Sequence, residues 1–373
     1  MNIVLAIQSL EIGGAERQVV ELAHSLGRLG HVVSICCLNR LGPLANEARD
    51  RGITVDCMNK TSRGDLRVIV NLARYLSGKK ANVLHTFLFG ANFWGTVAGR
   101  LAGIPVILTS DRSGGRYEEK KELWVDRVLQ HHIDGMITNT SAGKQRVRRL
   151  IGMPNERVHV IINGMNWERF GTLRDPAIVR RALGFAPDLF VVALAGTMRP
   201  VKNPAMFMRA ARLLSAESPR VVFLVIGGGP DIPGMQALAK VCSIDDRFRF
   251  TGQRHDVPEL LQAADAGVLC SHWEGFSNSI MEYMAAGLPV VATDVGGNRD
   301  LVQQHTTGFL VRPDDDGQLC EKLRWLSADA VMARSLGSAG KAWIRKNCDT
   351  TVLAKKTAAI YRALLEQKGR SPS

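Results

Sequence analysis

Short apolar segments that alternate with polar turns and amphipathic helices constrain the fold of this chain more than any other feature. The clearest example starts with a predicted strand at 266–269, continues through a polar turn and a helix that opens near 276–278, and ends in an apolar strand at 289–292. A strand, a helix and a strand in this order form a unit whose strands lie parallel. The same order recurs from residue 2 and from residue 190. The sequence therefore predicts an α/β chain with doubly wound sheets.

The helix that opens near residue 277 carries the strongest indication of a binding site. Ser277 and Asn278 can cap this helix while its first backbone N–H groups stay free, so the helix start offers donors and a positive dipole to an anion such as a phosphate. Glu274 lies in the preceding loop, and Glu282 lies about one turn inside the helix. A carboxylate behind a phosphate site suits ribose, because its oxygens accept hydrogen bonds from two adjacent hydroxyls. Two surface glutamates beside an ordinary turn are the simpler alternative.

This stretch resembles the E-x7-E signature of glycosyltransferase family 4, whose members are retaining enzymes of the GT-B fold. Glu274 and Glu282 are the two glutamates, and Gly275 and Phe276 follow the first of them. The other matching positions are Gly287, Pro289, Gly296 and Gly297. The resemblance implies two Rossmann-like, doubly wound domains that face a cleft. It also implies that the nucleotide-sugar donor is bound by Gly275, Phe276, Ser277, Asn278 and Glu282, and that Glu274 contacts the transferred sugar.

A second glycine-rich turn follows the first predicted strand, at 2–7. Gly13 and Gly14 open a helix that extends to residue 26, and bare glycine backbone lets a ligand approach a helix start. The pair lacks the spacing of dinucleotide-binding loops and the Lys-Ser/Thr of a P-loop, which disfavours dehydrogenases and NTPases. In family 4 a similar loop reaches the donor, so the resemblance implies that both glycines bind it. A tight turn with no ligand is the alternative.

Two cations follow the predicted strand at 190–195. Arg199 and Lys202 can point towards the helix start near Ser277, where together they could neutralise a diphosphate without a metal. The corresponding Arg-x-x-Lys pair of family 4 grips the donor pyrophosphate, although a charged pair on a loop is otherwise usually just solvated. Arg254 lies in a segment that resembles the family's loop beside the nucleotide base, and we expect it to contact the base.

The acceptor side of the predicted site is less complete. His85 ends the strand predicted at 83–86, at the sheet edge where α/β proteins bind ligands, and we name it as a candidate catalytic residue. A satisfied structural histidine is the equal alternative. Family members often have His-x-His here, and this chain lacks the second histidine. Where some relatives place a histidine after the next strand, this sequence has Asp111 and Arg112.

The domain boundary is expected where residues 161–170 resemble the family's Pro-Asn-Gly-Val-Asp-x-x-x-Phe junction. We predict an acceptor-side domain at 1–166 and a nucleotide-sugar-binding domain at 167–350. The resemblance implies that the last helix, at 351–373, crosses back onto the first domain.

Composition narrows the class of protein further. A hydrophobic content of 46% with 22% charged residues is globular, and no apolar run approaches the ~20 residues that span a membrane. With no basic, apolar leader, we expect a cytoplasmic enzyme, peripheral at most on the inner face of the cell membrane. Seven scattered cysteines give neither a disulfide framework nor paired metal spacing. Three consecutive aspartates at 314–316 are better explained as a helix start than as a metal site. No metal or other cofactor is expected.

The predicted function is a retaining hexosyl-type transfer from a nucleoside-diphosphate sugar, expected to be a UDP-sugar, to an acceptor hydroxyl. Arg199, Lys202 and the helix start would stabilise the leaving group. A nucleotide-sugar 2-epimerase of the same fold is one alternative, which needs no acceptor. A non-catalytic sugar-nucleotide-binding protein is another, although this chain keeps both cations and Glu274.

Charge supplies a hypothesis for the acceptor. The chain carries a net charge of +13, and residues 1–166 hold 22 Lys and Arg against 14 Asp and Glu. Nucleic acid is disfavoured as a partner, because this half has no recognisable binding module and few aromatics. A solvated basic face is the simpler reading. Our preferred hypothesis is an anionic membrane surface that brings the enzyme to a lipid-linked glycan of cell-envelope polysaccharide synthesis. The basic residues are Lys60, Arg63, Arg67, Arg74, Lys79, Lys80, Lys144, Arg146, Arg148 and Arg149.

Overall fold

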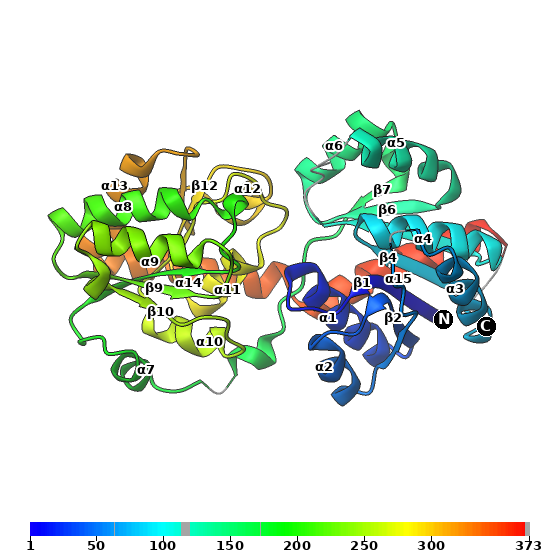
Figure 1. Ribbon diagram of the computed structural model, residues 1–373, viewed down its shortest axis with the longest axis horizontal. Helices are drawn as coiled ribbons and strands as arrows, with labels where there is room; N and C mark the ends of the chain where they lie inside the picture. Colours follow the sequence, from blue (N-terminus) through cyan, green and yellow to red (C-terminus); the bar gives the residue numbers. More distant parts are fainter. Residues whose placement is uncertain (63, 113–119, 172, 370–373) are drawn as a thin grey trace. The chain divides into compact units, whose positions relative to one another are not determined.

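The computed structural model describes residues 1–373 except 63, 113–119, 172 and 370–373. Its internal contacts divide the chain into two units (Figure 1). The first unit consists of Met1–Gly164 and Cys348–Ser373, and the second is Met165–Asn347. Each unit is built on one sheet of parallel strands, as the alternation of strands and helices in the sequence predicts.

The first unit has a seven-stranded sheet in the order β3-β2-β1-β4-β5-β6-β7. Its strands are β1 (Asn2–Ser9), β2 (Val32–Arg40), β3 (Thr54–Cys57), β4 (Val83–Phe87), β5 (Val106–Asp111), β6 (Gly135–Thr138) and β7 (Val158–Val160). Its α-helices are α1 (Gly14–Arg28), α2 (Leu44–Asp50), α3 (Arg67–Gly78), α4 (Phe89–Leu101), α5 (Lys120–Leu129), α6 (Ser141–Ile151) and α15 (Thr350–Gln367). Since the strand order reverses at β1 and β4, helices cover both faces of this sheet.

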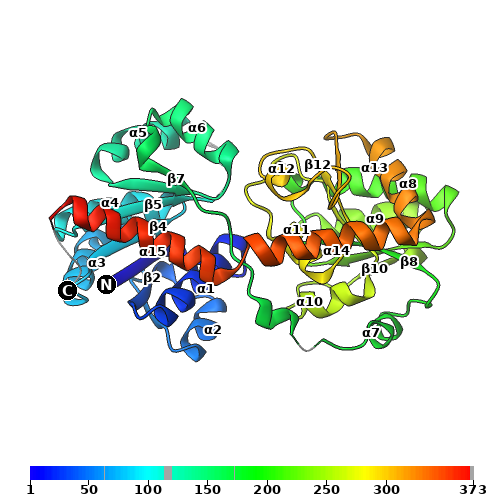
Figure 2. The same ribbon diagram turned by 180° about the vertical axis from the view of Figure 1, so that it is seen from behind.

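The central strand β1 shows how the sequence builds both faces. Ile3 and Leu5 point to one side, where they pack with α1, α2 and α15. Val4 and Ala6 point to the other, where they pack with α3, α4 and α6. This alternation follows from the two-residue period of a strand, and a strand covered on both faces is apolar throughout. Figure 2 shows α15 lying along the first of these faces.

The second unit has a six-stranded sheet in the order β10-β9-β8-β11-β12-β13. Its strands are β8 (Phe190–Ala195), β9 (Val221–Ile226), β10 (Phe248–Phe250), β11 (Ala266–Leu269), β12 (Val290–Thr293) and β13 (Gly308–Val311). Its α-helices are α7 (Pro176–Ala182), α8 (Pro204–Glu217), α9 (Ile232–Val241), α10 (Val257–Leu260), α11 (Asn278–Ala286), α12 (Asn298–Leu301), α13 (Asp316–Ala328) and α14 (Ala330–Asn347). Short 3-10 helices η3 (Trp167–Phe170) and η4 (Pro200–Lys202) carry residues of the candidate site.

The sequence did not predict the two outermost strands of this sheet, β10 and β13. Both are short, and each pairs with a single neighbouring strand, β9 or β12. Short edge strands bury less apolar surface than central strands, so their sequence pattern is weak. The aspartates at 314–316 do start a helix, because Asp315 caps α13 by accepting a hydrogen bond from Gln318 N at 2.9 Å.

Candidate functional site

The loops after β8 and β11 form the core of the candidate site in the second unit. These strands are neighbours in a parallel sheet, so the loops at their carboxyl ends lie side by side. The loop after β8 leads into η4, and the loop after β11 leads into α11. Residues from both loops therefore meet although the sequence separates them by about 70 positions, as in the ion pair of Lys202 with Glu274.

The start of α11 has the cap that the sequence predicts. Ser277 is the N-cap residue, and its side chain accepts a hydrogen bond from Ile280 N at 3.4 Å. Phe276 and Ser277 are buried, whereas Gly275 and Asn278 are half-buried. The helix is nine residues long, so its first turn carries a positive partial charge that favours an anion.

Glu274 is held from three sides in the loop before this helix. Its Oε1 accepts hydrogen bonds at 2.5 Å from both Lys202 Nζ and Ser271 Oγ. The backbone of Gly296 packs closely against the backbone carbonyl of Glu274. A Cβ at position 296 would lie 1.9 Å from the carbonyl oxygen, so only glycine fits there. Gly296 also has a φ of 49°, which glycine adopts without strain. The carboxylate is thus fixed in position, with a side chain that is 11% exposed.

Lys202 owes its position to a clamp on the next residue. Asn203 has a left-handed φ of 48°, caps α8 through Met206 N, and donates a hydrogen bond from Nδ2 to Asp314 Oδ1 at 2.8 Å. Arg199, in contrast, is exposed, and its side chain forms no ion pair with any residue that the structure describes. The structure therefore joins one of the two predicted cations to Glu274 and leaves the other in solvent.

Glu282 forms an ion pair that the sequence did not predict. Arg169 Nη1 lies 3.0 Å from Glu282 Oε1, and the two side chains are 18% and 16% exposed. Arg169 comes from η3, which is 113 residues away in sequence, so no local pattern could have revealed the contact. The next residue, Tyr283, anchors α11 because its hydroxyl accepts from Ala195 N and donates to Val268 O. The Glu282 carboxylate is therefore paired with a cation and carried on a fixed helix.

The predicted base contact, Arg254, is paired with Asp256. Its Nε and Nη2 donate to the two carboxylate oxygens of Asp256 at 2.8 and 2.6 Å. The arginine side chain is 45% exposed, so it stays accessible to solvent. A role in binding the base stays a prediction.

The remaining predicted residues lie in the first unit. Gly13 is the N-cap of α1 and Gly14 its first residue, and a Cβ on Gly13 would lie 2.2 Å from Glu16 Oε2. His85 is fully buried in β4, with Nδ1 2.6 Å from the Tyr361 hydroxyl and Nε2 2.7 Å from Ser110 Oγ. Burial, with the nearby Arg112 cation, holds the His85 pKa well below its usual value. Both ring nitrogens are occupied, which favours the structural alternative; a catalytic role stays a prediction.

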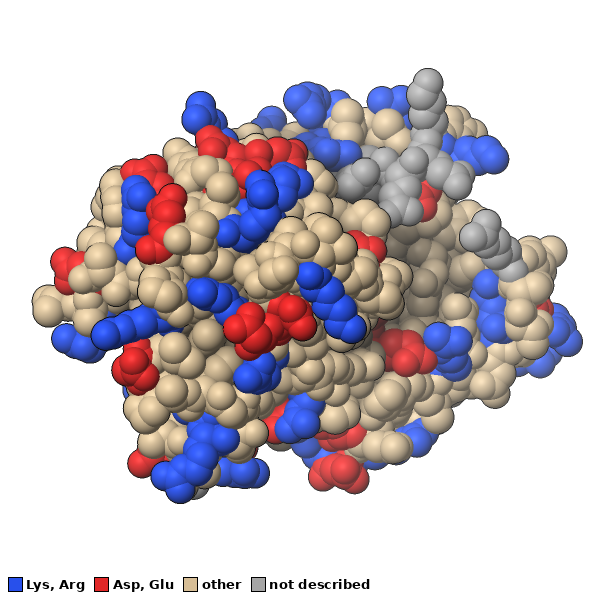
Figure 3. Space-filling model, turned by 60° about the vertical axis from the view of Figure 1, so that its left-hand side comes forward, with Lys and Arg blue, Asp and Glu red and all other residues tan. Residues whose placement is uncertain are grey.

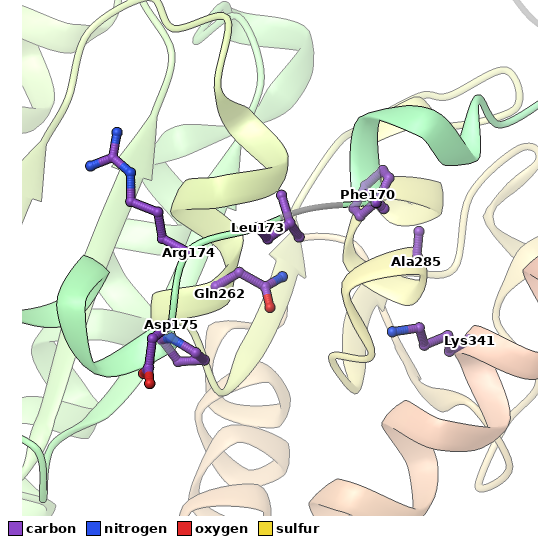
Figure 4. A pocket seen from close by; sticks show the side chains of 9 residues that line it. Phe170, Leu173, Arg174, Asp175, Gln262, Ala285 and Lys341 are labelled. Atoms are coloured by element: carbon purple, nitrogen blue, oxygen red, sulfur yellow. The ribbon is translucent and has the colours of Figure 1, made fainter.

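A cavity of about 320 Å³ in the second unit lies apart from the start of α11 (Figure 4). Figure 4 shows Phe170 of η3 and Ala285 near the end of α11 facing the same space, with Lys341 of α14 beside them. No residue of the predicted site lines it. The cavity is therefore distinct from the predicted anion site.

The described part of the chain contains neither a metal-binding cluster nor a membrane-spanning helix. Over those residues, no three His, Cys, Asp or Glu side chains are grouped closely enough to hold a metal ion. The described helices likewise include none with the length and apolar character needed to cross a membrane.

Comparison with known proteins shows relatives along almost the whole chain. Residues 12–169 match the family described as Glycosyltransferase Family 4, and residues 177–343 match Glycosyl transferases group 1. An Escherichia coli UDP-Gal:alpha-D-GlcNAc-diphosphoundecaprenol alpha-1,3-galactosyltransferase is 26% identical, over 74% of this chain and 74% of its own. A D-inositol 3-phosphate glycosyltransferase of Thermobispora bispora is 27% identical, over 97% and 92%. The structure of Anabaena HepE in complex with UDP matches with a TM-score of 0.86 at 22% identity, covering 97% of this chain and 100% of that one.

Proposed function

Since the chain belongs to the group 1 and family 4 glycosyltransferases and has their GT-B fold, we propose that it moves a sugar from a nucleoside-diphosphate donor to an acceptor hydroxyl with retention at the anomeric carbon. The observation that carries this proposal is the contact of Lys202 with Glu274 beside the start of α11. At one sheet edge, the cation and the helix start can bind the phosphates and stabilise their charge as the diphosphate leaves. The carboxylate can accept hydrogen bonds from the sugar hydroxyls.

In the reaction, the bond between the anomeric carbon and the diphosphate oxygen breaks, and the acceptor oxygen bonds to that carbon from the same face. The departing phosphate takes the acceptor proton. Arg199 and Lys202, with the first turn of α11, stabilise the negative charge that develops on the diphosphate, which is the role of preorganised donors in transfer reactions. On this account the donor draws Lys202 away from Glu274, and Glu274 then accepts hydrogen bonds from the sugar. The two cations stabilise the charge of the leaving diphosphate, which other transferases stabilise with a metal ion.

The nucleoside is held by the other end of the same site. Glu282 accepts hydrogen bonds from the ribose hydroxyls, while Arg169 keeps its charge compensated near the donor phosphates. Arg254 exchanges its contact with Asp256 for a contact with the base. The donor is a UDP-sugar, in keeping with the UDP-Gal in the name of the Escherichia coli relative and the UDP in the complex of Anabaena HepE.

The acceptor belongs to the first domain in this proposal, with residues 1–166 on the acceptor side, 167–350 binding the donor and 351–373 completing the first domain. The name of the Escherichia coli relative describes a diphosphoundecaprenol acceptor. By extension, the acceptor here is a lipid-linked glycan of cell-envelope polysaccharide synthesis.

Exposed side chains on α5 support docking of the first domain to an anionic membrane. Trp124 is 66% exposed and Val128 43% exposed, one turn apart. Arg127 lies between them and is anchored by a hydrogen bond from Nε to Leu150 O at 2.7 Å. Tryptophan beside arginine suits the membrane interface, where the indole enters the headgroup layer and the cation meets anionic lipid.

Two of the basic residues that the sequence analysis named for membrane docking, Arg67 and Lys79, support it less. Arg67 pairs with Asp65, and Lys79 lies 3.5 Å from Asp56, so their charges are partly compensated. Arg63 lies outside the described residues. Figure 3, in which the second unit comes forward, shows basic and acidic side chains interspersed on that face rather than gathered into one large basic patch.

Thermal stabilisation by a panel of UDP-, GDP- and ADP-sugars tests the donor assignment, because a ligand at about 100 times its Kd stabilises the folded state by about 2.7 kcal/mol. We expect a UDP-sugar to raise Tm most. If no nucleotide-sugar raises it, the donor assignment fails. An assay without acceptor separates the epimerase alternative, since only an epimerase converts the sugar under that condition.

Sedimentation with vesicles at low salt tests the membrane proposal. We expect binding to anionic vesicles that weakens in Trp124→Ala and persists in Trp325→Ala, a half-exposed tryptophan of the second unit. Equal binding to neutral and anionic vesicles, or none to either, would leave a soluble acceptor.

A further inference from the structure

A buried arginine that has no carboxylate partner among the described residues lies at the carboxyl edge of the first unit's sheet. Arg112 directly follows β5 and is 9% exposed. Its Nη1 donates to Asn163 Oδ1 at 2.8 Å, and its guanidinium carbon lies 5.4 Å from the centroid of the Phe87 ring. Its buried Nε has no hydrogen-bond partner among the residues that the structure describes. The guanidinium thus has donor capacity that the described residues leave unused.

Within the described part of the chain, the charge of Arg112 is also uncompensated. No carboxylate of the described residues forms an ion pair with it, and burial lowers its pKa to about 10. A half-buried arginine of the same unit shows the ordinary arrangement: Arg51 pairs with Glu21 at 3.0 Å and Glu47 at 2.9 Å. Burying a cation without a partner costs free energy. The arrangement of Arg112 therefore requires an explanation, whereas that of Arg51 does not.

The surroundings of Arg112 indicate a ligand with hydroxyls as well as charge. Asn139 follows β6, the strand next to β5, and is 2% exposed. Its Oδ1 is buried without a hydrogen-bond partner, whereas its Nδ2 lies 3.5 Å from Asn163 Oδ1. Unsatisfied buried polar atoms are rare in folded proteins, and two within one small cluster call for a common explanation. One donor and one acceptor are left without partners at the edge where parallel sheets bind ligands.

We infer that Arg112, with Asn139 and Asn163, forms a binding site for an oxyanion of the acceptor, a phosphate or carboxylate carried close to the hydroxyl that receives the sugar. The inference rests on the proposed function, which places the acceptor at this domain. It adds the residues that bind an anionic group of that acceptor. The planar guanidinium binds the oxyanion through paired N–H donors, as arginine does with phosphate and carboxylate. Asn139 accepts a hydrogen bond from a neighbouring hydroxyl.

Melting temperatures of the full-length chain test this site with two probes, methyl phosphate and acetate. Each is added at 100 mM against NaCl of equal ionic strength, with saturating UDP so that the donor site is already filled. A probe with a Kd of about 10 mM would raise Tm by about 2 °C. The two probes distinguish a phosphate site from a carboxylate site. The variants are Arg112→Met, Arg112→Lys and the matched control Arg51→Gln.

We expect one probe to raise the Tm of the wild type and of Arg51→Gln, but not that of Arg112→Met. Arg112→Lys should keep part of the increase in Tm, because lysine retains the positive charge but lacks the paired N–H donors of the guanidinium. Arg112→Met should melt no lower than the wild type, since it removes an unpaired buried charge, whereas Arg51→Gln should melt lower. The inference is overturned if neither probe acts beyond NaCl, or if the increment survives in Arg112→Met. Failure of UDP itself to stabilise the wild type would instead count against the proposed donor.

Discussion

Replacing Arg169 with glutamine is expected to weaken donor binding by about tenfold. The variant removes the 3.0 Å contact to Glu282 and leaves that carboxylate, 16% exposed, without its partner. The effect on UDP comes from the carboxylate, because without Arg169 its negative charge is uncompensated and repels the donor diphosphate. Two charges about 4 Å apart interact by about 1 kcal/mol in water and by about 4 kcal/mol near a protein surface, and about 1.4 kcal/mol corresponds to a tenfold change in Kd. Because both side chains are mostly buried, solvent screens only part of this repulsion.

Calorimetric titration of UDP into the wild type, Arg169→Gln, Glu282→Gln and the double variant measures the coupling. If Arg169 acts through Glu282, the two single changes should be non-additive by more than ~0.5 kcal/mol. Arg174→Gln is the matched control, because Arg174 belongs to the same segment and pairs with Glu259 at 2.6 Å but is 66% exposed. Unchanged UDP affinity in Arg169→Gln, or strictly additive effects, would refute the reasoning.

The other predictions concern turnover, metal dependence and pH. Arg199→Ala and Lys202→Ala should each lower kcat by about 10²–10³, the usual effect of removing one transition-state donor, with a smaller change in acceptor KM; a change confined to KM would remove the leaving-group role. EDTA should leave activity unchanged, and loss of activity that magnesium or manganese restores would contradict the proposed use of cations. Burial lowers the pKa of His85 from 6.5, so below about pH 6.5 the unfolded chain binds a proton that the folded chain does not, and stability should fall as pH drops. Between pH 8 and 5.5, the Tm of His85→Gln should fall less steeply than that of the wild type. Part of the slope should remain, because the pKa values of His31 and His159 are also lowered. Identical slopes in the two proteins would exclude His85 as the source.

The sequence located most of the fold because central parallel strands are apolar throughout. The strands predicted at 190–195 and 266–269 have those bounds in the structure. The sequence did not predict the edge strands β10 and β13, because a strand of three or four residues with one partner strand shows little hydrophobic pattern. The cap at Ser277 followed from local chemistry and was equally predictable.

Contacts between distant residues were harder to predict than elements. The spacing of Glu274 and Glu282 drew attention to both carboxylates, but nothing in it identified Lys202 and Arg169 as their partners. His85 shows the opposite difficulty, because a histidine at a strand end looks available until Tyr361, 276 residues away, is found on its ring nitrogen. Such contacts depend on the packing of whole elements rather than on local sequence.

A proton NMR time course of the UDP-sugar that best stabilises the chain, with and without a lipid-linked acceptor pool, tests the central claim most directly. The account predicts that UDP and a new glycosidic anomeric signal appear together only with acceptor, and that the product keeps the anomeric configuration of the donor. An inverted product would contradict retention. An epimerised sugar formed without acceptor would contradict glycosyl transfer itself.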